Sequence, residues 1–368
     1  MGSMSRTSVT DAHRCRSAVL DWYDAHGRDL PWRETRDPYA ILVSEVMLQQ
    51  TQVSRVVTYW PAFLDRFPSA EALASASLDD VLSAWSGLGY YGRARRLRAA
   101  AVQIVAEHGG VVPESPEALR RLPGIGKYTA AAVSSIAFNL PEPVLDANVV
   151  RVVARLLAFR EDASGAAGRR VLAAAAAGLL EPGRPGDSNQ ALMDLGATVC
   201  TPESPSCSSC PALPYCAAAA AGHPERFPSP ARRGATVETF EAVAVVARRG
   251  KVLLGKPGHE RGWWEGLWIP PRSPIDRVEE AAERLAGALA SIGLSGVLVP
   301  WGKTIRYTVT RHRVSTRVFA LESPRGALRK SSGWRWFSSE DLAGLALPAP
   351  YLRALSDRIG QLPLPGGR

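Results

Sequence analysis

The hydrophobic pattern of this chain changes once, and that change constrains its fold more than any other feature. Over residues 11–222, apolar residues recur at the three- and four-residue spacing of helices, between short Pro- and Gly-containing turns. Over residues 238–357, β-branched runs surround one helical pattern. A Pro-, Gly- and Arg-rich segment, 223–237, separates them. We therefore predict an all-α domain (11–222), a linker (223–237) and a smaller α+β domain (238–357).

Composition excludes several classes of protein. Hydrophobic residues make up 46% of the chain and charged residues 21%, which is typical of a globular protein and not of a disordered one. No stretch approaches eighteen uninterrupted apolar residues, and the first residues have no apolar signal core, so we expect a cytoplasmic protein without a membrane span. The formal net charge of +9 favours polyanionic partners, although an Arg-rich composition alone does not establish nucleic-acid binding.

Four of the five cysteines lie close together, in the spacing C-x6-C-x2-C-x5-C: Cys200, Cys207, Cys210 and Cys216. Four thiolates can bind either Zn²⁺ or a 4Fe-4S cluster. Zinc sites usually pair two C-x2-C units, whereas one such unit with longer flanking segments suits a larger group. This spacing resembles the iron–sulfur loop of the endonuclease III and MutY families of DNA glycosylases, which implies a 4Fe-4S cluster.

A glycine-rich turn, LPGIGKY, lies between two helical stretches. Gly124 and Gly126 allow a sharp turn with outward N–H groups, and the following helix adds the positive end of its dipole. Lys127 adds a positive charge. Glycine turns between helices are common, but LPGIGKYTA resembles the helix-hairpin-helix element of the same glycosylase superfamily. The turn is therefore predicted to bind a DNA phosphate.

Two carboxylates lie at informative positions. Asp146 directly precedes an apolar helical stretch, which predicts an N-cap; the same position would also suit a carboxylate that stabilises an oxocarbenium-like sugar. Glu45 shares a helix face with Ile41 and Leu48, so burial is expected to favour its protonated form. A buried arginine partner is the alternative role for such a glutamate.

Seven segments in order resemble the MutY adenine DNA glycosylases: RDLPWR, DPYAILVSEVMLQQT, GLGYYGRARRL, LPGIGKYTAAAV, LDANVVRV, NQALMDLGATVC and the cysteine loop. The resemblance implies that Glu45 is the general acid that protonates adenine and that Asp146 is the catalytic aspartate, supported by Tyr128 and Asn148. Endonuclease III lacks this glutamate. It also implies an adenine pocket of four residues: Arg28, Trp32, Arg33 and Gln190.

The resemblance extends to the substrate. It implies binding, as a monomer associated with the nucleoid, to double-stranded DNA that contains adenine opposite 8-oxoguanine or guanine. Gln50, Thr51 and Tyr90 match positions that enter the base stack; the alternatives are a helix C-terminus and a core tyrosine. Tyr128 replaces the lysine with which bifunctional relatives form an imine, so we expect a monofunctional enzyme that leaves an abasic site.

The second domain resembles the MutT-like, Nudix-fold domain of that family, including GLWIPP. The segment EEAAERLAGALASIG lacks the carboxylate run with which a Nudix hydrolase binds Mg²⁺, so this domain should recognise 8-oxoguanine without hydrolysing a nucleotide. Where the family commonly has Phe-Ser-His, this chain has Val309, Thr310 and Arg311. Thr310 keeps the hydroxyl, and His312 lies one position later.

Two other functions compete with this interpretation. An endonuclease III-type lyase for oxidised pyrimidines is disfavoured by Glu45, Tyr128 and the second domain. A non-enzymatic, cluster-bearing DNA-binding or redox-sensing protein is opposed only by the presence of both Glu45 and Asp146.

Overall fold

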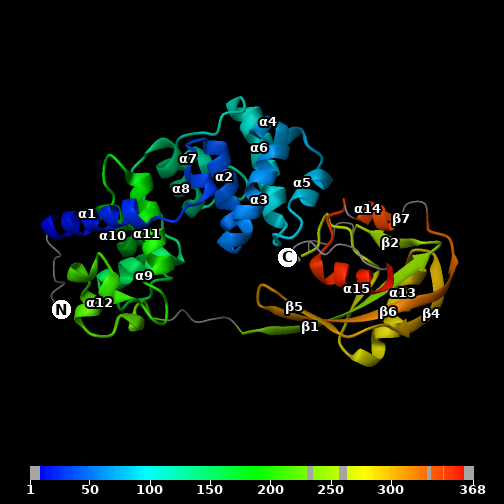
Figure 1. The fold of residues 1–368 in the computed structure, drawn as a ribbon. Helices are drawn as coiled ribbons and strands as arrows, with labels where there is room; N and C mark the ends of the chain where they lie inside the picture. The colour runs from blue at the N-terminus through cyan, green and yellow to red at the C-terminus, as the bar shows by residue number, and fades with distance from the viewer. Residues whose placement is uncertain (1–8, 230–234, 257–262, 330–332, 343, 360–368) are drawn as a thin grey trace. The chain divides into compact units, whose positions relative to one another are not determined.

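The computed structural model describes residues 9–229, 235–256, 263–329, 333–342 and 344–359. The chain divides into two compact units (Figure 1). The first, called the helical unit, comprises Met1–Ala72 and Ala99–Arg233; the second, called the sheet unit, comprises Leu73–Arg98 and Gly234–Arg368. The segment Leu73–Arg98 groups with the C-terminal residues in the structure. The hydrophobic pattern of the sequence gives no sign of this grouping.

Within the described residues the helical unit contains α1 (Val9–His26), η1 (Pro31–Arg33), α2 (Pro38–Leu48), α3 (Val53–Arg66), α7 (Pro116–Leu119), α8 (Lys127–Phe138), α9 (Ala147–Leu156), α10 (Ala166–Gly178), α11 (Pro185–Thr198), η2 (Cys207–Ser209), η3 (Leu213–Tyr215), α12 (Ala217–Ala220) and η4 (Pro224–Arg226). The division between the units falls inside α4 (Ala70–Ser75) and α6 (Gly92–His108).

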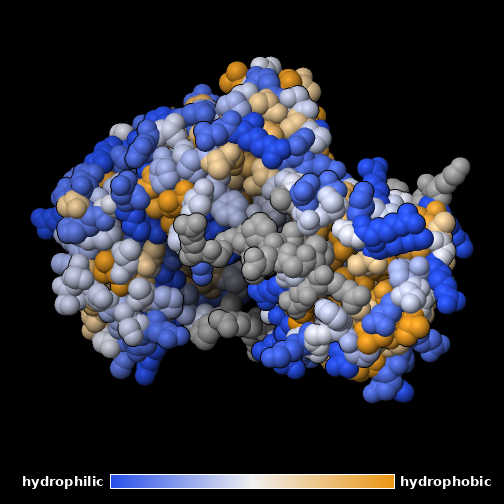
Figure 2. All heavy atoms as spheres, turned by 45° about the vertical axis from the view of Figure 1, so that its right-hand side comes forward, coloured by the Kyte–Doolittle hydropathy of each residue, from blue (hydrophilic) through white to orange (hydrophobic). Residues whose placement is uncertain are grey.

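Hydrophilic side chains cover much of the surface visible in Figure 2. No described helix combines the length and the apolarity that crossing a membrane requires.

Two helices set the geometry of the helical unit. Helix α2 begins where the Asp37 carboxylate caps the N–H groups of Tyr39 and Ala40, and its residues 39–47 are all buried. Helix α11 packs closely on α8 and α9 because glycines lie at both contacts. A Cβ on Gly186 would lie 2.6 Å from the Ser135 carbonyl oxygen, and one on Gly196 would lie 2.6 Å from the Cβ of Asn148.

The sheet unit contains α5 (Leu78–Ala84), β1 (Val237–Arg248), β2 (Lys251–Gly255), β3 (Arg272–Ile275), η5 (Val278–Glu280), α13 (Ala281–Ser291), β4 (Leu294–Pro300), β5 (Ile305–Val309), β6 (His312–Gly326), β7 (Trp334–Phe337), α14 (Ser339–Leu342) and α15 (Ala349–Ile359). The strand order is β4-β6-β1-β2-β7, with β3 paired to β1 and β5 to β6. Strands β1 and β6 are parallel, whereas the other pairs are antiparallel.

Helices cover both faces of this sheet (Figure 1). Because side chains alternate along a strand, Ala242, Ala244 and Val246 pack with α13, whereas Val245 packs with α14 and α15. The prediction of a smaller α+β domain is thereby confirmed.

A buried carboxylate, Glu241 on β1, lies on the α15 side of the sheet. It accepts hydrogen bonds from the hydroxyls of Thr316 (2.7 Å), Tyr307 (2.8 Å) and Tyr351 (3.1 Å). The Arg272 guanidinium lies 3.1 Å away and completes the group. Glu241 thus joins β1 to four other elements: β3, β5, β6 and α15.

We predict that Glu241→Ala lowers the free energy of unfolding by about 3–5 kcal/mol, because it leaves Arg272 without its buried partner. Glu241→Gln keeps an acceptor oxygen and should cost less. Denaturant unfolding of the full chain measures both, with the exposed Thr308→Ala as the control. Equal unfolding midpoints for Glu241→Ala and Thr308→Ala would contradict the prediction.

Candidate active site

A cavity of about 240 Å³ opens in the helical unit between η1, α2, α8, α11 and the start of α9. Drug-sized ligands occupy roughly 300–1,000 Å³, so this cavity suits something as small as a single nucleobase. Its wall contains all eight residues predicted to act in catalysis or to form the adenine pocket: Arg28, Trp32, Arg33, Glu45, Tyr128, Asp146, Asn148 and Gln190.

Glu45 is the most unusual group in this wall. Its residue is only 3% exposed, and burial raises the pKa of its carboxyl to about 7. A hydrogen bond from the Tyr128 hydroxyl lowers this pKa, the charge of Asp146 raises it and the charge of Arg33 lowers it. The carboxyl oxygen Oε2 has no hydrogen-bond partner among the described residues. Half-protonated near neutral pH, Glu45 can donate a proton into the cavity.

Asp146 lies at the start of α9, as the N-cap that its position predicts. Its carboxylate accepts from the N–H of Val149 at 2.6 Å and from the side-chain amide of Asn148 at 3.0 Å. Burial raises the pKa of Asp146, while these two hydrogen bonds oppose the rise. The carboxylate is therefore fixed in direction at the edge of the cavity.

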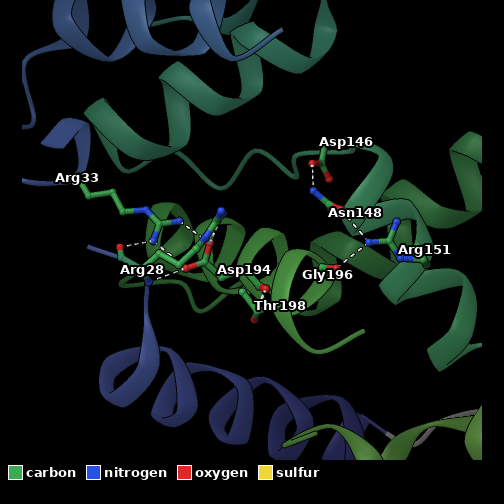
Figure 3. Close-up of polar contacts among 8 residues, drawn as sticks. All are labelled: Arg28, Arg33, Asp146, Asn148, Arg151, Asp194, Gly196 and Thr198. Carbon is green, nitrogen blue, oxygen red and sulfur yellow. Dashed lines mark hydrogen bonds and ion pairs between the residues drawn. The ribbon is translucent and has the colours of Figure 1, made fainter. Parts of the chain in front are cut away.

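Arg151, one turn along α9, holds this arrangement in place (Figure 3). Its guanidinium donates to the side-chain oxygen of Asn148 at 2.8 Å and to the carbonyl of Gly196 at 2.7 Å. It also donates to the carbonyl of Cys200 at 2.7 Å. A continuous series of hydrogen bonds thus joins Asp146 to the first cysteine of the cluster through Asn148 and Arg151.

Sequence reasoning missed Asp194 on α11, which binds both predicted pocket arginines (Figure 3). Its fully buried carboxylate accepts from Arg28 at 2.6 Å and from Arg33 at 2.7 Å. Burial raises the pKa of Asp194, but the hydrogen bonds from Arg33 and Arg28 outweigh it, so its pKa is lowered. The only signal in the sequence is a lone aspartate within the apolar segment NQALMDLGATVC.

The glycine-rich turn lies between α7 and α8. Gly124 adopts a φ of +79°, which favours glycine, and the buried Ile125 anchors the turn. Gly126 is the N-cap of α8 with extended backbone, and an added Cβ there would meet no atom within 4 Å. Lys127 is exposed, while the next residue, Tyr128, lines the cavity.

The residues predicted to enter the base stack have unusual backbones. Gln50, between α2 and α3, is exposed and has a φ of 58°, and Thr51 beside it lines the cavity. Tyr90 has a φ of 49° and is 45% exposed, with the Arg93 guanidinium 5.6 Å from its ring centre. The alternative of a core tyrosine is therefore wrong. Positive φ at bulky residues costs free energy and concentrates at functional sites.

All four clustered cysteines are free and line one small cavity of about 20 Å³. Backbone N–H groups donate to the sulfurs of Cys210 and Cys216. Within the parts of the chain that the structure describes, no three His, Cys, Asp or Glu side chains converge closely enough to hold one metal ion. Four thiols around one cavity are a donor set that could hold a thiolate-bound metal group.

Buried Arg155 fastens the cysteine loop to α9. Its guanidinium donates to the Cys200 sulfur at 3.3 Å and to the carbonyls of Thr201 and Pro202, each at 2.7 Å. Its Nε donates to the carbonyl of Phe227 at 3.0 Å. The two ends of the loop are thereby held on one side chain.

In the sheet unit, the predicted lesion-recognition residues form the turn between β5 and β6. Thr310 is exposed with a φ of 53°, and its hydroxyl donates to the Val309 carbonyl at 2.7 Å. Arg311 is also exposed. The His312 ring lies 3.1 Å from the Thr239 hydroxyl and contacts the Trp263 ring at its edge, with ring centres 5.0 Å apart.

The two domains match known families. Residues 43–173 match the HhH-GPD superfamily of base excision DNA repair proteins, and residues 242–357 match the NUDIX domain. A structure of a thermostable thymine-DNA glycosylase is 30% identical and covers 58% of this chain and 98% of its own, with a TM-score of 0.53. A non-covalent endonuclease III–DNA complex, 22% identical over the same shares with a TM-score of 0.51, supports the fold. Fold and site together define a base-excision DNA repair enzyme with an added Nudix-like domain.

Relatives that match over most of both chains identify the family within this class of repair enzymes. The adenine DNA glycosylase of Mus musculus is 35% identical over 93% of this chain and 77% of its own length. That of Mycobacterium tuberculosis (strain ATCC 25618 / H37Rv) is 46% identical over 77% of this chain and 92% of its own. The chain belongs to the adenine DNA glycosylase family, whose members hydrolyse an N-glycosyl bond in DNA.

We predict that Glu45→Gln stabilises the fold above pH 7. The folded-state pKa of Glu45 is raised, so the ionisation penalty is absent below pH 4.5, grows between pH 4.5 and about 7, and is constant above that. The neutral variant removes this penalty, which amounts to about 3 kcal/mol at 1.36 kcal/mol per pKa unit. Unfolding free energies of the two proteins below pH 4.5 and above pH 7 measure it; a variant no more stable at the higher pH would refute it.

Proposed function

We propose that this enzyme removes adenine paired with 8-oxoguanine or guanine in duplex DNA, acting as a monomer at the cytoplasmic nucleoid and leaving an abasic site. The observation that carries the proposal is a buried carboxyl with a pKa of about 7 in a base-sized cavity, beside a second, fixed carboxylate.

Protonation of the base is the first step of the proposed mechanism. A stacked adenine is out of reach, so the nucleotide rotates out of the duplex, which costs least at a mispair. Glu45 then donates its proton to N7 and makes adenine a neutral leaving group. A catalytic acid works best with a pKa near the operating pH, and burial supplies that value here. Arg28, Trp32, Arg33 and Gln190 form the pocket around the base.

Stabilisation of the sugar is the second step. Loss of adenine leaves an oxocarbenium-like deoxyribose, and Asp146 stabilises its positive charge. The carboxylate needs no reorientation, since Val149 and Asn148 already hold it. Water then adds to the sugar carbon that carried adenine, and the proton it releases restores the protonated form of Glu45. Tyr128 cannot form an imine, and Lys127 is exposed and precedes the residue that lines the cavity, which supports a monofunctional reaction.

Two groups of residues are proposed to bind DNA. Gly124, Gly126 and Lys127 at the start of α8 bind a phosphate through backbone N–H groups and charge. Gln50, Thr51 and Tyr90 contact the opened base stack. Contacts to DNA phosphates do not depend on the base sequence, which suits an enzyme that scans DNA.

The cysteine loop is proposed to hold a 4Fe-4S cluster through Cys200, Cys207, Cys210 and Cys216. Four free thiols around one cavity, with N–H groups directed at two sulfurs, support this assignment. When bound, the cluster would fix the loop that Arg151 and Arg155 connect to α9.

The sheet unit is proposed to read 8-oxoguanine through the turn Val309, Thr310 and Arg311, without nucleotide hydrolysis. The exposed Thr310 side chain in a tight turn supports contact with a base.

Base release under single-turnover conditions tests the proposal, on duplexes with adenine opposite 8-oxoguanine, guanine or thymine, and with thymine glycol. Adenine release at 8-oxoguanine is expected, slowing as pH rises above about 7, because the protonated fraction of Glu45 falls. Glu45→Gln should slow it by about 10²–10⁴-fold.

Each alternative has its own outcome. Thymine glycol release with borohydride trapping would indicate a lyase, and no release at all would indicate a DNA-binding protein. Equal rates opposite guanine and 8-oxoguanine, unaffected by Thr310→Ala, would remove only the lesion-recognition role.

We predict that Gly126→Ala weakens DNA binding without unfolding the protein. The backbone there is extended and the added methyl meets nothing, so only an approaching phosphate would contact it. Fluorescence anisotropy with duplex DNA and the thermal unfolding midpoint measure the two effects. Wild-type affinity in this variant would exclude the turn as a phosphate site.

A further inference from the structure

The long strands β1 and β6 leave part of one sheet face uncovered by α13. Where α13 packs, this face is apolar, with Ala242 on β1 and Phe319 and Leu321 on β6. Toward the N-terminal ends of both strands, residues on the same face become exposed: Phe240 is 39% exposed, and residues 313 and 317 are exposed. Strands β5 and β6 are joined by the turn between Val309 and His312, so this turn borders the same end of the sheet.

Strand register brings three arginines together on this face. Arg306 on β5 pairs with Ser315 on β6, and the neighbours of Ser315 on the same face are Arg313 and Arg317. Diagonal neighbours on a sheet face lie about 7–8 Å apart, within reach of long side chains. Phe240 pairs with Ser315 from the other side. We call Arg306, Arg313 and Arg317 the arginine triangle.

The charges of the arginine triangle are poorly compensated. Glu238 on β1 lies 3.7 Å from Arg313, in a pair whose side chains are 54% and 69% exposed. Arg306 and Arg317 have neither an ion pair nor a side-chain hydrogen bond with any described residue. Like charges at neighbouring positions on a sheet destabilise it. A binding partner with negative charge would remove that cost.

We propose that the arginine triangle binds the phosphate backbone of the substrate duplex. The guanidinium group matches phosphate oxygens in shape and charge, and the residue between the three arginines is the small Ser315. The inference rests on the enzyme acting on duplex DNA, and does not depend on the mispair or on the chemistry of base release. It assigns the sheet unit a sequence-independent contact beside its β5–β6 turn.

The test is the salt dependence of DNA binding by the full chain. Each lost phosphate contact reduces the slope of log K against log salt by about 0.9, so Arg306→Gln/Arg317→Gln should reduce it by about 1.8. The matched control is Arg325→Gln/Arg353→Gln, which removes the same charge from exposed positions at the far end of β6 and on α15. Glu238→Gln should tighten binding, because it frees Arg313.

Three outcomes are distinguishable. A reduced slope in the triangle variant alone, with wild-type thermal unfolding and wild-type adenine release at saturating enzyme, supports the proposal. Equal slopes in the two double variants overturn the proposal. If the slopes are equal and only the triangle variant has lost binding to poly-glutamate, the face binds an acidic protein segment instead. A wild-type enzyme that binds DNA but releases no adenine would refute the proposed function and leave the slope comparison valid.

Discussion

The close contact of α11 with α8 and α9 is the constraint on which the helical unit depends. Gly196 leaves no room for a Cβ against Asn148, so the start of α9 is set by a backbone contact. Asp194, two residues earlier, places the pocket arginines, and Arg151 binds the Gly196 carbonyl. One helix therefore positions groups on both sides of the cavity, and the chain continues from it directly into the cysteine loop.

Two carboxyl groups near the cavity have opposite environments, one that lowers the pKa and one that raises it. Asp194 is saturated by two arginines and stays ionised, whereas Glu45 receives one hydroxyl and keeps an oxygen without a described partner. Both arginines are thus engaged with Asp194, and the charge of Arg33 has the smallest of the four effects on the pKa of Glu45. An unsatisfied buried oxygen reduces stability, and carboxyl groups with raised pKa values are concentrated at sites of proton transfer.

Local patterns predicted much of this architecture. The spacing of Ile41, Glu45 and Leu48 predicted a buried acid, and the position of Asp146 predicted an N-cap; both are confirmed. Long-range pairing escaped prediction: Asp194 meets arginines more than 160 residues away. Two strands have little signal in the sequence: Gly296 and Pro300 interrupt the apolar pattern of β4, and β7 has only four residues. Such pairings depend on tertiary contacts that no local window contains.

Arg155 has a consequence for the assembly of the cysteine loop. Its donors bind main-chain carbonyls at both ends of the segment 201–227, so the folded helical unit already holds the ends of that loop together. Closing a flexible loop costs conformational entropy that rises with its length. Because Arg155 already holds the two ends, the proposed cofactor would have only the interior of the loop to order. Because the partners are carbonyls, side chains along the loop are free to vary while its path is kept.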